Sequence, residues 1–470
     1  MRNFLSLYQA NLFKKLLLLL VILFFPTILV ASEGKALSIG PVRFEFIVFG
    51  LILTGIVFFH KHTFKVAVTG VLVLILLKLI FVTQFNLTEH IFGTNSFASQ
   101  VLNKTMRQGE WGIILNLTGL LLGFAVLAKI FAQSGIPEKL PDYLPDDWKG
   151  GFLLLIFIFF LSAFLDNIAA ALIGGTIALV IYKKKVHIGY IAAIVAASNA
   201  GGSGSIVGDT TTTMMWIDGV SPLNVLHAYI AAGVALIFFG YFASRQQDRY
   251  QRIQKDATPD IKIDWVKILI VGFILVSAVI FNIIYDMPAL GVWIAILAGS
   301  TLRPIPWKAV KGSIKGTIFL ICLVISASLM PVEELPGASW FSTLILGLIS
   351  AVFDNIPLTK LCLDQGHYDW GMLAYSVGFG GSIIWFGSSA GVAIANIFPD
   401  ASDVKKWLKE GWHITAAFII GFFVLYLIMG WEPADNKKHK IINCPVPGCP
   451  MANKLTASGQ GDSVTFYCLK

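Results

Sequence analysis

Long apolar runs separated by short polar segments recur along the chain from residue 16 to residue 430. Most of these runs approach the length of about 20 predominantly apolar residues that a helix needs to cross a bilayer. The pattern therefore predicts an all-α polytopic membrane protein. Single spans are predicted at 42–60, 65–83, 111–132, 225–243, 268–284, 288–302, 316–331 and 412–430, with a polar loop at 84–109.

Two apolar stretches are interrupted by nearly the same polar phrase. Residues 162–168 read Ser-Ala-Phe-Leu-Asp-Asn-Ile, and residues 350–356 read Ser-Ala-Val-Phe-Asp-Asn-Ile. The first phrase divides a stretch, 150–182, that is too long for one ordinary span, and the second divides 339–363. Each stretch predicts a re-entrant helical hairpin whose irregular tip lines a cavity inside the protein.

A broken helix is predicted after each hairpin. Stretch 187–217 contains a run of Ser, Asn and Gly at 198–205, and stretch 371–397 contains glycines and serines at 378–389. Such runs predict unwound backbone that faces a binding site. Lys residues in the short loops place the open end of the first hairpin inside and that of the second outside. The sequence thus predicts two inverted repeats, each with a re-entrant hairpin and a broken transmembrane helix.

Composition narrows the function classes. The chain is 56% hydrophobic and 13% charged, with a formal net charge of +8. Because the Lys and Arg residues fall mostly in short loops, this charge indicates topology in a lipid bilayer and not a nucleic-acid partner. The chain shows no phosphate-binding loop and no nucleophilic triad, so we do not expect an enzyme.

The predicted segments follow from the same pattern. A basic start, an apolar run and small residues at the N-terminus are typical of a signal peptide, and a retained first helix is the alternative. We divide the chain into 1–31 (signal-like or first transmembrane segment), 32–149 (N-terminal spans and loops), 150–243 (first hairpin and broken helix), 244–338 (basic inner loop and scaffold helices), 339–430 (second hairpin and broken helix) and 431–470 (Cys-containing tail).

Both hairpin phrases resemble those of NhaD-type sodium/proton antiporters. Further similar phrases are Asn-Ala-Gly-Gly at 199–202, Gly-Asp with four Thr at 208–213, and Gly-Gly-Ser at 380–382. These antiporters belong to the ion transporter superfamily, together with arsenite permeases and carriers of citrate and divalent anions. The resemblance covers roughly residues 110–430. It implies an inverted-repeat fold, a homodimer and a multi-pass location in a bacterial inner membrane.

The sequence also departs from that family in two places. Three alanines follow the first Asp-Asn pair at 169–171, where NhaD proteins usually have hydroxyl residues. Residues 204–207 read Gly-Ser-Ile-Val, where the family usually has Trp-Ser-Pro-Ile. Both departures remove or move oxygen atoms near the expected site.

Three acidic residues are predicted near the membrane midplane: Asp166, Asp209 and Asp354. An ionisable group inside a bilayer is costly and usually marks an ion or substrate pathway. Hard cations bind oxygen ligands, and a carboxylate can hold a proton instead, which suits exchange of Na⁺ or Li⁺ for H⁺ without a cofactor. The candidate ion-binding residues are Asp166, Asn167, Asn199, Ser203, Ser205, Asp209, Thr210, Asp354, Asn355, Ser382, Ser388 and Ser389.

Other interpretations of these residues stay open. Symport of citrate or another dicarboxylate is the alternative function, although uncompensated Asp residues would repel such a substrate. The Asp-Asn pairs could serve as helix caps, since both residue types cap helices well. Lys360 could neutralise a site carboxylate, but we expect it to extend toward the outer surface. Glu110 and Asn116 could join the proton path.

The C-terminal tail carries a separate candidate site. Cys444, Cys449 and Cys468, with His439 upstream, could form a zinc site, although the spacing is not a standard one. A disulfide from Cys444 to either other cysteine is an alternative if the tail lies in an oxidising compartment. A plain tail without either feature is the third possibility.

Overall fold

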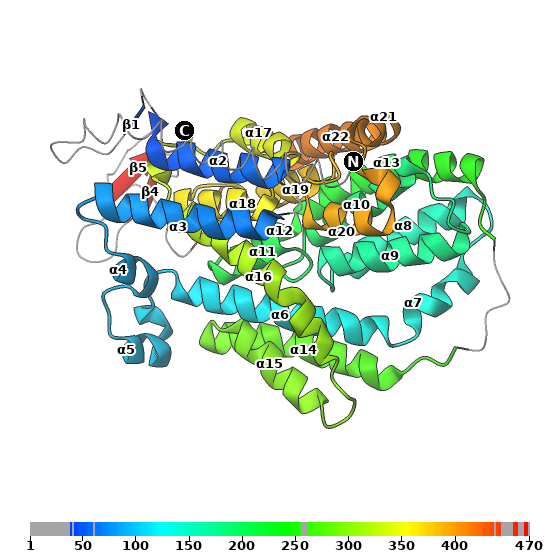
Figure 1. The fold of residues 1–470 in the computed structure, drawn as a ribbon, viewed down its shortest axis with the longest axis horizontal. Helices are drawn as coiled ribbons and strands as arrows, with labels where there is room; N and C mark the ends of the chain where they lie inside the picture. Colours follow the sequence, from blue (N-terminus) through cyan, green and yellow to red (C-terminus); the bar gives the residue numbers. More distant parts are fainter. Residues whose placement is uncertain are drawn as a thin grey trace, which may run out of the picture. The chain divides into compact units, whose positions relative to one another are not determined.

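The computed structural model describes residues 38–39, 42–59, 62–254 and 261–436, together with the backbone of three short tail strands (Figure 1). Nearly all of the described chain is helical, as the apolar pattern predicts. Six described helices are long and apolar enough to cross a membrane. The signal-like segment 1–31 lies outside the described residues. The six segment boundaries drawn from the sequence stay predictions.

Two compact units divide the chain. The first comprises residues 1–110 and 325–331, and the second comprises residues 111–324 and 332–470. In the first unit, the two predicted spans form helices that pack against each other. The expected polar loop contains short helices capped by Asn86 and Ser96. The elements of this unit are β1 (Ser38–Ile39), β2 (Val42–Arg43), α2 (Phe44–Phe58), α3 (Thr63–Phe81), α4 (Leu87–Phe92), α5 (Phe97–Leu102) and η2 (Lys104–Met106).

Three helices of the second unit pack side by side: α6 (Trp111–Ala132), α14 (Trp265–Tyr285) and α15 (Pro288–Gly299) (Figure 1). Gly123 permits the close approach of α6 to α15, because a Cβ there would lie 2.4 Å from Val292. The next helix, α16 (Trp307–Ser328), begins well before the predicted residue 316.

Polar contacts fix the ends of these helices. Asp264 caps α14 and accepts a hydrogen bond of 2.9 Å from Arg303 Nε, which holds the pKa of the Asp264 carboxyl below its usual range. The Asn116 side chain on α6 donates to Asp286 O and accepts from Ala289 N. Asn116 therefore joins α6 to the turn between α14 and α15.

Both predicted hairpins are present, and each turns at its Asp-Asn pair. The first consists of α8 (Trp148–Ser162) and α9 (Asn167–Ile181), and the second of α17 (Trp340–Ser350) and α18 (Asn355–Gln365). Fifteen residues of helix extend about 22 Å, which is less than the roughly 30 Å of bilayer hydrocarbon. These lengths suit hairpins that end within the membrane.

Both broken helices are also present, but the first break lies later than predicted. The first consists of α10 (Ile188–Gly202) and α11 (Thr210–Ile217), so the break is at 203–209 and not at 198–205. The glycines near 201 serve close packing and not unwinding, because a Cβ at Gly201 would lie 2.0 Å from Phe159 O. The second consists of α19 (Trp370–Gly380) and α20 (Ser389–Ile397), within the expected range.

Matching contacts join each hairpin to its broken helix. Ser162 Oγ donates to Ser198 O at 2.6 Å, and Ser350 Oγ donates to Val377 O at 2.7 Å. The two serines occupy the same place in the repeated phrase. The contacts therefore repeat along with the sequence, while the inverted membrane orientation of the two halves stays a prediction.

The remaining helices frame these elements. α13 (Ala228–Tyr250) is longer than the predicted span and packs against α8 and α22 (Trp412–Met429). Tyr375, Phe379 and Phe418 stack in parallel between α19 and α22. The shorter elements are α7 (Ile136–Lys139), η3 (Leu140–Tyr143), α12 (Leu223–Leu226), η4 (Val332–Glu334), η5 (Pro399–Ser402) and α21 (Val404–Glu410).

Backbone pairing in the tail forms a three-stranded antiparallel sheet of β3 (His439–Ile442), β4 (Leu455–Ser458) and β5 (Thr465–Cys468). Cys444 and Cys449 lie outside the described residues, and so do the side chains of His439 and Cys468. The zinc and disulfide hypotheses for this tail stay predictions.

Candidate functional site

Asp209 lies at the centre of the candidate site. This residue precedes the first turn of α11, and its side chain is 1% exposed. Asn167 Nδ2 donates to Asp209 Oδ1 at 3.0 Å, and Asn355 Nδ2 approaches Asp209 Oδ2 at 3.4 Å. The two asparagines begin α9 and α18. Both hairpin tips therefore meet at one buried carboxylate.

A second chain of contacts extends this site across both broken helices. Asn199 Oδ1, in the last turn of α10, accepts a 3.0 Å hydrogen bond from Asn167 Nδ2. Asn199 Nδ2 donates to Ser382 Oγ at 2.9 Å, within the break between α19 and α20. All three side chains are buried. Five of the residues expected from the sequence thus form one network: Asn167, Asn199, Asp209, Asn355 and Ser382.

One oxygen atom of this network has no hydrogen-bond partner. Asn167 Oδ1 is buried and accepts no hydrogen bond, while Asn167 Nδ2 already donates twice. Leaving a buried polar atom unsatisfied costs about 1–3 kcal/mol. An amide oxygen beside a carboxylate is also a suitable ligand for a hard cation. The residue can therefore accept either a cation or a hydrogen-bond donor.

The other two acidic residues flank Asp209. Asp209 lies close enough to both Asp166 and Asp354 for direct electrostatic repulsion. Asp354 accepts hydrogen bonds from Ile356 N at 3.1 Å and from Ser389 Oγ at 3.3 Å, so it caps α18 as the alternative interpretation expected. Asp166 precedes α9 without a side-chain capping bond.

Three of the expected hydroxyl residues form hydrogen bonds with backbone atoms and do not join the network. Ser203 Oγ donates to Ala200 O at 2.7 Å, within its own turn. Ser205 Oγ donates to Ala163 O at 2.6 Å and so ties the first break to the first hairpin tip. Ser388 Oγ accepts from Gly391 N and caps α20. A role for these hydroxyls as ion ligands stays a prediction.

Helix ends add a favourable field at the network. Asn167, Asn355 and Thr210 each occupy the first position of a helix, so the N-terminal ends of α9, α18 and α11 converge there. The partial positive charge at these ends stabilises a nearby carboxylate. The negative charge of Asp209 is thus stabilised by helix ends and amide groups. Among the described residues, no cluster of three His, Cys, Asp or Glu side chains is suited to a metal ion.

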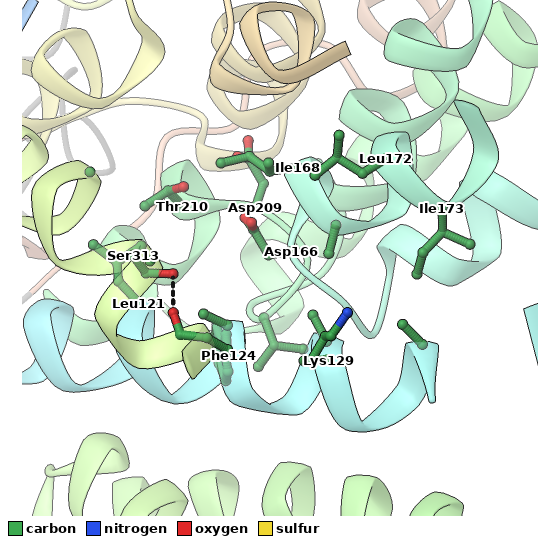
Figure 2. A pocket seen from close by; sticks show the side chains of 18 of the residues that line it. Leu121, Phe124, Lys129, Asp166, Ile168, Leu172, Ile173, Asp209, Thr210 and Ser313 are labelled. Atoms are coloured by element: carbon green, nitrogen blue, oxygen red, sulfur yellow. Dashed lines mark hydrogen bonds between the residues drawn. The ribbon is translucent and has the colours of Figure 1, made fainter. Parts of the chain in front are cut away.

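A pocket of about 870 Å³ reaches this region from one side. Its lining comes mainly from α6, α9 and α16, with parts of α7 and α11, and it includes Asp166, Asp209 and Thr210. Figure 2 shows Asp166 and Asp209 near each other above α6, and Lys129 farther along that helix. The sequence predicted only Glu110 and Asn116 at the start of α6 for the proton path, and it did not predict that α6 and α16 line a pocket. The small residues Gly312, Ser313 and Gly316 on α16 were the available signal.

Lys360 differs from its expected position. Its side chain is fully buried, and Lys360 Nζ lies 2.8 Å from Asp364 Oδ1, one turn farther along α18. The ammonium group points toward the helix end, as expected, but it does not reach the surface. Asp364 thus pairs with this buried charge.

Comparisons with known proteins identify the class. The chain is similar to "Sodium/proton antiporter 1" of Arabidopsis thaliana, with 27% identity over 52% of this chain and 49% of the relative. It is 24% identical to the "Na(+)/H(+) antiporter NhaD" of Alkalimonas amylolytica, over 53% of this chain and 62% of that protein. It is 23% identical to the "46 kDa membrane protein" of Mycobacterium leprae, over 68% and 88%. The match to the plant antiporter thus spans about half of that relative.

The family is established by a longer match. The sequence model described as "Citrate transporter" matches residues 51–380, which is well over half of the chain. The family and these relatives are named mainly for transport and not for catalysis. The chain therefore belongs to the citrate transporter family, as a multi-pass integral membrane protein.

Proposed function

We propose that this protein exchanges a monovalent cation, Na⁺ or Li⁺, for protons at the Asp209 network. The observation that carries the proposal is the burial of one carboxylate between the two hairpin-tip amides of Asn167 and Asn355. A site of this kind offers oxygen ligands to a small cation. The names of the antiporter relatives support the same class of substrate.

Exchange follows from what the site can hold. A cation at Asp209 could take the carboxylate oxygens together with the free Asn167 Oδ1 as ligands. A protonated Asp209 would instead carry an O–H donor, which could satisfy that same amide oxygen. Either occupant relieves the unsatisfied atom and neutralises the carboxylate. The two occupants compete, and such competition couples their movements in opposite directions.

The flanking acids strengthen this competition. Asp166 and Asp354 repel a charged Asp209, so a proton or cation on any one of the three carboxyl groups changes the binding at the others. Asp166 lies on the pocket side, where an ion would arrive. Asp354 lies beside Ser389 in the second repeat. We assign Asp166 the role of attracting the cation as it enters from the pocket. We assign Asp354 the role of tuning the affinity of Asp209 for a cation or a proton.

Symport of citrate or another organic anion is the second candidate. It is favoured by the family description and by the N-terminus of α20, which the neutral hydroxyl of Ser388 caps, although Asp354 accepts from Ser389 in the same turn. Helix N-termini bind carboxylates well. The three acids around this point oppose such a substrate, and we therefore place it second.

The proposal extends to setting and assembly. A bacterial inner membrane suits the similarity to a bacterial NhaD protein. A homodimer is the assembly that the resemblance to NhaD-type antiporters implies.

Everted membrane vesicles test the proposed exchange. Vesicles that contain the protein should lose an imposed pH gradient when Na⁺ or Li⁺ is added, as reported by a pH-sensitive dye. Asp209→Asn should abolish the response, whereas Asp146→Asn at an exposed loop position should respond like the wild type. No response to any monovalent cation, together with cation-dependent citrate uptake, would favour the organic-anion alternative.

A further inference from the structure

The pocket beside Asp166 is much larger than one alkali ion needs. Its volume of about 870 Å³ falls in the range of sites for small organic molecules, about 300–1,000 Å³. Most of its walls are apolar side chains from α6 and α9. Examples are Leu120, Leu121, Phe124, Ile168, Leu172 and Ile173. The walls therefore suit a ligand with an apolar part, which an inorganic ion does not have.

Charged groups divide the pocket into two ends. Asp166 and Asp209 lie together in one wall, where no Lys or Arg side chain lines the pocket. Lys129, in the last turn of α6, and Glu138, in α7, belong to the other end. Lys129 is exposed, so water screens its charge. An organic guest would meet a negative field beside the acids.

Two glycines lie among the α16 residues that line the pocket, which also include Thr317 and Leu320. Gly312 and Gly316 line the pocket, and a Cβ added at either would have no atom within 4 Å. Ser313 Oγ, between them, donates to Ala309 O at 3.1 Å and leaves little donor capacity for an anionic guest. The missing side chains at these two glycines leave open space in the pocket wall.

We propose that this pocket binds amphipathic organic monocations, such as alkylammonium ions, with the cationic head beside Asp166 and Asp209. The apolar body would pack between α6, α9 and α16. The inference rests on the proposed function only in treating Asp209 as an ionised carboxylate. It adds a class of ligand, and it implies that such a ligand competes with the transported cation from the pocket side.

Direct binding to the purified full-length protein in nanodiscs tests this inference. Hexyltrimethylammonium, titrated calorimetrically with empty nanodiscs as reference, should bind saturably. Hexanesulfonate, which has the same chain length and the opposite charge, should not. Asp166→Asn should weaken binding at least about tenfold because it removes a charge near the cationic head. Gly316→Phe should weaken it similarly because the ring fills the open space.

A matched variant distinguishes filling of the pocket from a general loss of structure caused by a bulky substitution. Gly272 on α14 is exposed, also has open space at its Cβ position and does not line the pocket, so Gly272→Phe should bind like the wild type. Equal binding by wild type and Gly316→Phe, or equal binding of hexanesulfonate, would overturn the inference. Because no ion gradient is involved, saturable and charge-selective binding would stand even if vesicles showed no cation/proton exchange.

Discussion

Asparagine side chains make more of the hydrogen bonds that hold the candidate site together than its three acidic side chains do. Asn167 and Asn355 bring both hairpin tips to Asp209, and Asn199 links the first tip to Ser382. The repeated Asp-Asn phrase predicted that both residue types lie at the site, but it did not predict that the Asn side chains would be the ones that contact Asp209. Orientation depends on the helix starts: each Asp occupies the cap position, and each Asn begins the helix.

The flanking acids give the first prediction at this scale. Asp166→Asn and Asp354→Asn should each lower the rate of cation-driven proton movement at least about tenfold, equivalent to about 1.4 kcal/mol. The change removes a charge, while Asn caps a helix as well as Asp does, so α18 should keep its cap at position 354. The rate is measured in proteoliposomes, with Asp146→Asn as the control.

Expression and thermal midpoint show whether a lower rate arises from misfolding. Both variants should match the wild type in each measurement. Wild-type transport rates in both variants would show that neither charge is needed for transport, and would leave Asp354 with its capping role alone.

At the level of elements, the sequence located both hairpins and both broken helices but misplaced the first break. The Ser-Asn-Gly run at 198–205 is typical of unwound backbone, yet α10 stays regular through Gly202. The glycines there permit backbone contact between helices, which local sequence does not distinguish from a break. The pocket wall of α16 was missed because its predicted start, residue 316, excluded Gly312.

Close packing of α10 against α8 gives a second prediction. Gly201→Ala should destabilise the protein by about 1–3 kcal/mol, because its Cβ would lie 2.0 Å from the backbone oxygen of Phe159. Gly233→Ala is the matched control, since this α13 glycine has open space at its Cβ and Ala favours helix by about 0.5–1 kcal/mol. Thermal midpoints of the purified variants compare the two. A Gly201→Ala midpoint equal to that of the wild type would show that the helices can separate without loss.

In the second unit, the open ends of the two hairpins lie near opposite ends of α13. At the start of that helix, His227 Nε2 lies 2.7 Å from Asp369 Oδ1, beside the open end of the second hairpin. Near its other end, Gln247 Nε2 donates to Lys185 O, at the open end of the first hairpin. A 23-residue helix extends about 34 Å, slightly more than the bilayer hydrocarbon. This separation supports the predicted inverted orientation.

Sidedness gives the third prediction. Single cysteines at Lys185→Cys and Gln365→Cys, in a background with the native cysteines replaced, should react with a membrane-impermeant maleimide from opposite sides of the membrane. We expect residue 185 to label only in everted vesicles, because the Lys-rich turn at 183–185 favours the cytoplasm. Residue 365 should label only in right-side-out cells, because residues 363–370 contain no Lys or Arg. Lys405→Cys, in the short helix α21 that should share the cytoplasmic side, is the control for residue 185. Labelling of 185 and 365 from the same side would contradict the inverted repeats, and the Asp209 network would then lack the two opposed hairpins on which alternating access to it depends.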